Sequence, residues 1–306
     1  MKSLAAALMI FALLPKSADA SALDELRDVV ARGSHVIMAD IENDSMLLQR
    51  DDGFYTSGMR FRSTWTLVEG AQARTWSWHI GQELYTASDI KLQPAQIAAN
   101  DHPYAGWLHT GLQRQVTDRG GGFRLLGLDI GCLGPCAGGE LTQKTLHSLI
   151  NQAQPQAWST QLRNEFGVVL HGGWAPARWT PVHWFDAQPS LQGRFGNIFT
   201  DATAEVTMRA GRLNWHAQQP ALFGYLRAGA RAVGYNATLQ GGYFSDKRAR
   251  TVDPRRGVAE LELGVTWQGR RFGLTAAVVR RGNEIAGLPN SQGSQNFAKV
   301  QLVLRP

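Results

Sequence analysis

Long runs of alternating apolar and polar residues are the feature that most constrains this chain. In residues 259–268, alanine, leucine, valine and tryptophan occupy every second position, and glutamate, glycine, threonine and glutamine lie between them. Residues 76–83, 202–211 and 226–232 follow the same pattern. A period of two over about ten residues predicts β-strands with one apolar and one polar face.

Strands of this length with charges on the polar face favour a membrane barrel over a soluble sandwich, whose strands usually have about 5–6 residues. We count about twelve such segments, an even number as bacterial single-chain barrels require. They lie near residues 35–47, 55–69, 74–86, 104–118, 122–133, 166–175, 180–194, 199–213, 221–237, 254–269, 271–284 and 294–305. The sequence therefore predicts one all-β domain, residues 21–306, folded as a closed antiparallel transmembrane β-barrel.

The first twenty residues have the pattern of a signal peptide. Lys2 precedes the apolar run Leu4–Leu14, and Ala18-Asp19-Ala20 is a small-x-small cleavage signal. The run is shorter than the roughly 20 residues that a spanning helix needs. We therefore expect residues 1–20 to be removed on export, and the mature chain to be a monomer in the outer membrane of a Gram-negative bacterium.

Charge and motifs exclude several function classes. The pI near 9.6 suits contact with anionic lipid headgroups, but no basic run or nucleic-acid motif is present. The chain has no Gly-x-Ser-x-Gly, His-Glu-x-x-His, P-loop or dinucleotide-binding motif. We therefore expect no nucleic-acid partner, and neither a nucleotide enzyme, a zincin nor an α/β-hydrolase.

The alternation stops between about residues 134 and 165. Leu146, Leu149 and Ile150 follow helical spacing, which predicts a helix within a long loop, and a second short helix is expected over 158–164. Such an excursion is where a barrel carries function. Cys132 and Cys136 precede it, and only a fold-back at Gly134-Pro135 would let them form a disulfide, so their pairing stays open.

Three groups of residues could carry chemistry. Glu42-Asn43-Asp44 offers hard oxygen ligands suited to Ca²⁺, although a polar strand end would look the same. Thr56 and Ser57 open the next strand, where a hydroxyl could hold water, ligate a metal or act as a nucleophile.

The third group lies on the predicted loop helix. Gln143 and His147 are four residues apart and so share one face, and His147 is the best-placed general base in the chain. The other histidines are taken as structural. They are His35, His79, His102, His109, His171, His183 and His216.

Taken in order, these pieces resemble a known family. The Asn-Asp pair, "YTSG", "LHTGL", "LDIGCLGPCAGGELTQKTLHSLI" and "AWSTQLRNEFG" are similar to the outer-membrane lipid A 3′-O-deacylases of the LpxR type. The likeness spans the mature chain and is strongest from Leu108 to Gly167. Its most specific part is the "DIG-x-x-GP-x-A-GG" segment followed by Gln-x-x-x-His.

The resemblance implies a twelve-stranded outer-membrane barrel that removes an ester-linked 3′-acyloxyacyl chain from lipid A of lipopolysaccharide, with Ca²⁺. The implied site lies between the barrel wall and a loop helix. It makes His147 the general base for a water, with Gln143 and Thr56 supporting it. Asn43 and Asp44 would belong to the calcium site, and Lys91 would contact the anionic headgroup.

Other functions remain open on the sequence alone. Ser57 or Thr56 could act as a nucleophile with His147 as its base. The lumen-facing Arg227, Arg231 and Glu262 would suit a non-catalytic barrel, either a narrow pore or a structural protein. A third possibility is a different outer-membrane lipase that acts on phospholipid. A regular strand would also point Asn43 and Asp44 to opposite faces, so we expect a bulge there or a backbone role for one of them.

Overall fold

A computed structural model of the chain describes residues 22–47, 53–214, 219–245 and 250–306. The predicted signal peptide lies outside these residues. The strands are β1 (Ser34–Asn43), β2 (Phe54–Glu69), β3 (Gln72–Thr86), β4 (Ala105–Asp118), β5 (Phe123–Leu133), β6 (Glu165–Ala175), β7 (Trp179–Val182), β8 (Phe185–Gly196), β9 (Phe199–Arg212), β10 (Ala221–Asn236), β11 (Gly257–Gln268), β12 (Phe272–Arg281) and β13 (Gln295–Leu304). The helices are α2 (Ala22–Arg32), α3 (Gly139–Leu149), α4 (Ala237–Gln240) and α5 (Asn290–Gly293).

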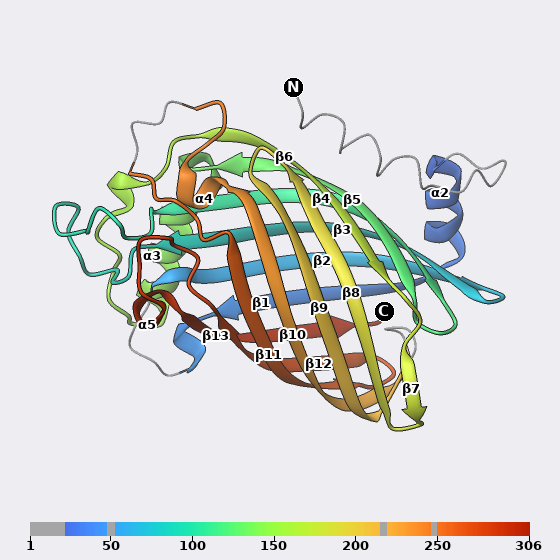
Figure 1. The fold of residues 1–306 in the computed structure, drawn as a ribbon. Helices are drawn as coiled ribbons and strands as arrows, with labels where there is room; N and C mark the ends of the chain where they lie inside the picture. Colours follow the sequence, from blue (N-terminus) through green and yellow to red (C-terminus); the bar gives the residue numbers. More distant parts are fainter. Residues whose placement is uncertain (1–21, 48–52, 215–218, 246–249) are drawn as a thin grey trace.

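The strands form one closed antiparallel barrel (Figure 1). Neighbours in sequence pair with each other, β1 pairs with β13, and β6 pairs with β8 to close the ring. Of the thirteen strands, β7 is a short arm on β8, and the other twelve make up the wall. The predicted fold class and strand number are confirmed.

Two predicted strands differ in their bounds. The segment 180–194 contains a turn at His183-Trp184, so that β7 and β8 form a hairpin there. The segment 35–47 ends early, because β1 stops at Asn43 and a 3₁₀ turn follows at Ser45–Leu47. The Asn43 side chain starts that turn by accepting a hydrogen bond from the Ser45 backbone N–H at 2.8 Å.

The two faces of the wall differ as the alternation predicts. Large apolar side chains such as Trp78, Ile80, Leu128 and Leu263 point outward and are exposed. The opposite positions carry charges that pair with charges on neighbouring strands, as Arg60 does with Glu83 and Arg281 with Glu260. The lumen encloses a cavity of about 290 Å³, which is lined by both acidic and basic residues such as Glu42, Glu83, Arg60 and Arg281. An apolar outside and a polar inside are what a barrel in lipid requires.

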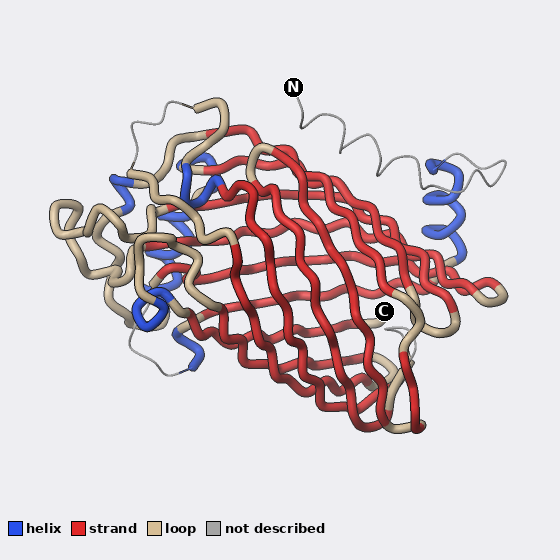
Figure 2. The backbone as a smooth tube through the Cα atoms, in the orientation of Figure 1, coloured by secondary structure: helices blue, strands red, loops and turns tan. Residues whose placement is uncertain are grey.

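The two ends of the barrel also differ (Figure 2). The end that we call the loop end carries long connections, residues 44–53, 87–104, 134–164, 237–256 and 282–294, with α3, α4 and α5. The other, the turn end, has tight turns at 70–71, 119–122 and 269–271. In membrane barrels the long loops face the outside of the cell. Among the described residues, no helix is long and apolar enough to cross a membrane.

Helix α2 was not predicted and lies at the turn end, beside the outside of the wall (Figure 1). The Glu25 carboxylate accepts hydrogen bonds from Arg114 Nε at 2.7 Å and Nη2 at 2.6 Å, and from Trp76 Nε1 at 3.0 Å. Arg114 lowers the pKa of Glu25 by these hydrogen bonds, against the opposing effect of burial. Val29, on the same helix, is fully buried.

The 134–164 loop holds the predicted helix and one wrong prediction. Helix α3 begins and ends close to the expected positions. The second expected helix, 158–164, is only a 3₁₀ turn at Trp158–Thr160, because Gln161 is already extended. Cys132 and Cys136 are joined by a disulfide with Cα atoms 6.0 Å apart. Gly134 makes the fold-back between them with a φ of 92°, which favours glycine.

Candidate active site

Helix α3 packs on the outer face of β3 and β4. The side chain of Leu84 points to the outer face of β3, as those of Trp78 and Ile80 do. It is only 2% exposed, however, because the 134–164 loop covers it. The fit is close: a Cβ on Gly139 would lie 2.9 Å from Leu84 Cδ2, and one on Gly106 would lie 3.0 Å from Ala137 Cβ. Gln82 Nε2 also donates to Ala137 O at 2.7 Å. The loop therefore folds down on the side of the wall that faces lipid.

Gln143 lies on the buried face of α3, with 1% of its surface exposed. Its Oε1 accepts a hydrogen bond from Trp158 Nε1 at 2.8 Å. Trp158 in turn packs with Leu84 and Tyr104 in one buried cluster. This hydrogen bond fixes the orientation of the amide, so that Nε2 points away from Trp158. The buried Nε2 has no hydrogen-bond partner among the described residues. A buried amide donor without a partner suits a ligand oxygen or a water.

His147 lies one turn further along the same face and is 3% exposed. Its Nδ1 is 2.6 Å from the carbonyl oxygen of Ala153. Because a carbonyl can only accept, Nδ1 must carry the hydrogen, and the neutral ring then has its lone pair on Nε2. A histidine whose tautomer is fixed in this way is prepared to take a proton at Nε2.

The start of β2 contains a bulge at Thr56. Tyr55 pairs with Tyr85 and Ser57 pairs with Leu84, which leaves Thr56 as the extra residue. A bulge of this kind turns consecutive side chains toward one side. Thr56 Oγ1 lies 2.7 Å from Thr86 Oγ1. Ser57 pairs with Leu84 on β3, so both side chains are on the outer face of the wall. The irregularity that the sequence suggested near Asn43 therefore lies in the neighbouring strand.

Asn43 and Asp44 complete this side of the site. Asn43 pairs with Ser57 and so lies in the same outward row as Ser57 and Leu84. Its Oδ1 accepts hydrogen bonds from the backbone N–H and hydroxyl of Ser45. Asp44 follows the end of β1 and is 5% exposed. Its Oδ1 accepts from Ser45 N at 2.7 Å and its Oδ2 from Gly53 N at 3.0 Å.

Lys91 lies in the 87–104 loop and its side chain is exposed. Its backbone N–H donates to Asp89 Oδ1 at 2.8 Å. The loop is tied to the segment after α3, because Gln156 N donates to Ile90 O at 2.9 Å. Lys91 therefore lies at the rim of the same group of loops and is not among the buried residues.

The structure brings most of the predicted residues to one place. Asn43 pairs with Ser57, and Ser57 pairs with Leu84, so these residues form one row across β1, β2 and β3. The loop that carries α3 covers the Leu84 end of this row. Sequence reasoning missed Trp158 and Thr86, which orient Gln143 and Thr56. Trp158 lies within the quoted "AWSTQLRNEFG", but nothing in a linear sequence shows which amide an indole will contact.

Solved structures were compared with this chain, and one of them superposes well on the whole barrel. The structure of LpxR from Salmonella typhimurium superposes with a TM-score of 0.71 at 22% identity, covering 88% of this chain and 99% of that one. The β domain of the Bordetella autotransporter BrkA gives a TM-score of 0.47 at 11% identity, covering 90% and 99%. The translocator domain of NalP from Neisseria meningitidis gives 0.45 at 10% identity, covering 92% and 94%.

No curated protein matches the chain in sequence. The family model described as "Outer membrane protein LpxR" matches residues 4–305, which is nearly the whole chain. An apolar barrel exterior, a polar lumen and a loop helix closed over the lipid-facing wall are what such a protein needs. The chain belongs to the LpxR family of outer membrane proteins.

Proposed function

We propose that this protein is a lipid A deacylase, an ester hydrolase that removes the 3′-linked acyloxyacyl chain from lipopolysaccharide. Family membership supports this function, and so does the position of the site. The site lies outside the barrel wall at the loop end, the end that faces the outside of the cell in membrane barrels. The observation that carries the proposal is His147, buried on α3 with its Nδ1 hydrogen fixed on Ala153 O.

In the proposed reaction His147 Nε2 takes a proton from a water, and the water oxygen attacks the ester carbonyl. The bond between that carbonyl and the sugar oxygen then breaks. The imidazolium returns the proton to the sugar oxygen, so that a hydroxyl and a free acid result. Gln143 Nε2, held by the bond between its Oε1 and Trp158, would donate to the water or to the developing oxyanion.

The oxygen-bearing residues at the start of the barrel wall fit a Ca²⁺ ion. Asp44 is buried, and each of its carboxylate oxygens accepts a backbone hydrogen bond, which fixes the orientation of the carboxylate. With Asn43, Thr56 and Ser57 it forms an all-oxygen donor set, which is the kind that Ca²⁺ prefers. We propose that these residues hold the ion. When bound, Ca²⁺ would polarise the ester carbonyl as a Lewis acid.

The exposed charge of Lys91 suits the headgroup of the same substrate. It lies on a loop that is hydrogen-bonded to the segment after α3, so a lipid held under α3 would place its polar end near this loop. Lipid A headgroups are anionic, and an exposed ammonium at the rim would attract them. We therefore assign Lys91 to substrate binding and not to the chemical step.

The direct test is mass spectrometry of lipid A from Gram-negative cells that express the protein with Ca²⁺. Wild type should produce lipid A that lacks one acyloxyacyl group. His147→Ala should reduce this product by about 10²-fold or more. Lys144→Ala is the matched control, because Lys144 lies on the same helix but is exposed, and its ammonium pairs with the exposed Glu140. Intact lipid A from cells with folded wild-type barrel would disprove the proposal.

Two alternatives give different outcomes in related experiments. A covalent acyl adduct trapped on Ser57 or Thr56 would replace the water mechanism with a nucleophilic one. Release of acyl chains mainly from phospholipid, when both lipids are supplied, would identify a phospholipase. A pore is disfavoured by the lumen itself, where Arg227 pairs with Glu262 at 3.5 Å and Arg231 pairs with Glu284.

A further inference from the structure

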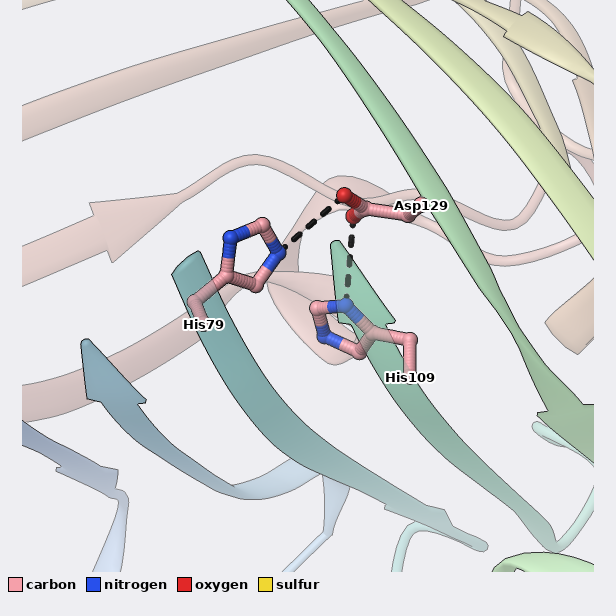
Figure 3. Close-up of side chains that lie close together, drawn as sticks. All are labelled: His79, His109 and Asp129. Atoms are coloured by element: carbon pink, nitrogen blue, oxygen red, sulfur yellow. Dashed lines mark ion pairs between the residues drawn. The ribbon is translucent and has the colours of Figure 1, made fainter. Parts of the chain in front are cut away.

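Four neighbouring strands each place one ionisable side chain at a common point inside the barrel. They are His79 on β3, His109 on β4, Asp129 on β5 and His171 on β6. Figure 3 shows His79 and His109 on either side of the Asp129 carboxylate. The outward neighbours of these residues, such as Trp78 and Leu128, face lipid, so the cluster lies on the lumen side. It is therefore separated by the wall from the site under α3.

The four side chains contact each other at short range. His79 Nε2 lies 3.1 Å from Asp129 Oδ1, and Asp129 Oδ2 lies 3.2 Å from His109 Nδ1 and 2.9 Å from His171 Nε2. His79, His109 and Asp129 are almost fully buried, with side chains 3%, 3% and 6% exposed. Their donor atoms all lie within 4.8 Å of one another. Within the described parts of the chain, this is the one histidine-rich group with such spacing.

These contacts do not have the geometry of hydrogen bonds. Asp129 Oδ1, both ring nitrogens of His109, and His171 Nε2 are buried polar atoms that have no hydrogen-bond partner within the described structure. The ring nitrogens therefore lie close to the carboxylate oxygens but miss the angles of a good hydrogen bond. Buried polar atoms in folded proteins nearly always have a partner, so their common focus indicates a missing ligand.

Glycines leave the room that the cluster needs. A Cβ on Gly111, which lies between His79 and Asp129 in the register, would be 2.1 Å from Asp129 Oδ1. A Cβ on Gly81, the partner of His109 on β3, would be 2.7 Å from His109 Nε2. The His109 ring is also held in place by stacking on Trp107, with centroids 5.6 Å apart and planes at 4°. The wall is thus shaped around these side chains.

We propose that His79, His109, Asp129 and His171 bind a divalent transition-metal ion of the zinc type inside the barrel. Imidazole nitrogens with one carboxylate suit Zn²⁺, whereas Ca²⁺ prefers oxygen donors only. A tetrahedral ion with bonds of about 2.05 Å holds its donor atoms about 3.3 Å apart. The ring nitrogens lie 2.9–3.2 Å from the carboxylate oxygens, and the donor atoms of His79, His109 and Asp129 lie within 4.8 Å of one another. The ion would tie together the four strands β3–β6, two of which carry α3 on their other face. It goes beyond the proposed hydrolysis and takes no part in it.

The lumen gives the ion a path to the cluster. His109 also lines the lumen cavity of about 290 Å³, which lies among charged residues. Polar walls and water would let a hydrated ion reach the rings without crossing lipid. Four acidic residues, Asp40, Glu42, Glu83 and Glu284, line this cavity together with six basic ones.

The test uses the full-length barrel, purified in detergent, stripped with a strong chelator and then dialysed against ZnCl₂. Elemental analysis should find about one zinc ion per chain in wild type. The double variant His109→Gln/His171→Gln lacks two of the four proposed ligands. It should therefore lose on the order of 90% or more of that zinc. His35→Gln is the control, because His35 lies on β1 and hydrogen-bonds Ser63 instead. Wild type without bound zinc, or equal zinc in the double variant, would overturn the proposal.

Two further measurements do not depend on removing a ligand. Cobalt(II) added to the stripped wild-type barrel should give the intense visible bands of tetrahedral coordination, and zinc should abolish them. Gly111→Ala keeps every proposed ligand but puts a methyl group against the Asp129 carboxylate and the Leu128 carbonyl oxygen, so it should lower the zinc content of the folded fraction severalfold. Octahedral cobalt spectra, or full zinc binding by folded Gly111→Ala, would contradict the geometry proposed here. None of these readouts depends on deacylase activity.

Discussion

Trp158 donates its indole hydrogen to Gln143 Oε1 at 2.8 Å, and both side chains are fully buried between the 134–164 loop and the barrel wall. This hydrogen bond decides which end of the Gln143 amide faces the site. It also joins the 3₁₀ turn at Trp158–Thr160 to α3, so that two parts of the same loop are held together where the loop packs on the strands.

Trp158→Phe tests that relationship. Phenylalanine keeps most of the packing with Leu84 but removes the donor, so Gln143 can rotate and its Nε2 is no longer directed. A hydrogen bond of this kind contributes about 1 kcal/mol, so we expect deacylation to fall roughly fivefold to tenfold with the barrel still folded. Mass spectrometry of lipid A measures the change. Trp184→Phe, at an exposed position, is the control and should have no effect. Unchanged turnover by Trp158→Phe would show that the orientation of Gln143 does not matter.

The calcium proposal predicts that deacylation depends on Ca²⁺ and that Asp44 determines the affinity for the ion. A calcium chelator should stop deacylation by the purified protein, and Ca²⁺ should restore it better than Mg²⁺, which demands a stricter octahedral shell. Asp44→Asn removes the one carboxylate of the donor set and should raise the Ca²⁺ concentration needed for half-maximal activity at least tenfold. Asp253→Asn, at an exposed loop position, is the control. Activity that survives chelation would rule out the ion.

Glu284 predicts a loss of stability at acid pH. It lies in the 282–294 loop, where burial would raise its pKa, but Arg231 and Arg281 outweigh burial and His102 adds to their effect, so that its pKa is about 2. The unfolded value is near 4.3, so the group stabilises the fold above that pH and loses this contribution as the pH falls toward 2. The change corresponds to about 3 kcal/mol.

Urea unfolding in detergent between pH 7 and pH 2 measures this effect. Wild type should lose stability mainly below about pH 4.5. Glu284→Gln should be less stable than wild type at pH 7. Its free energy of unfolding should also fall less steeply at acid pH, because the side chain at position 284 no longer titrates. If both proteins have parallel profiles, another carboxylate controls acid unfolding.

Helix α2 should detach when its anchor is removed. Glu25 receives two hydrogen bonds from Arg114 and one from Trp76, and a bidentate charged pair of this kind is among the stronger hydrogen-bonded contacts. Glu25→Gln should therefore make residues 22–32 accessible to limited proteolysis, while the barrel stays resistant. Asp24→Asn changes an exposed neighbour on the same helix and should remain protected. Equal protection of both variants would mean that Val29 and its apolar contacts hold the helix alone.

The sequence by itself determined the barrel. Alternation is a local property, since each strand shows lipid on one side and polar lumen on the other, and this pattern predicted twelve wall strands close to their observed bounds. Helix α3 also follows from local spacing, and with it the shared face of Gln143 and His147. Helix α2 is as long as α3, but it was not predicted because it lies between the predicted signal peptide and the first alternating segment. Strand β7 was merged with β8 because the turn at His183-Trp184 has no glycine or proline.

Only the tertiary structure decided how separate strands are aligned. Register is set by ladder hydrogen bonds between segments far apart in the chain, so the bulge at Thr56, and the row of Asn43, Ser57 and Leu84, cannot be read from spacing. The same holds for the lumen. His79, His109, Asp129 and His171 were scattered residues with no shared motif, and they meet because four antiparallel strands place them at one height. Local periodicity specifies which face a side chain takes, and long-range pairing specifies its neighbours.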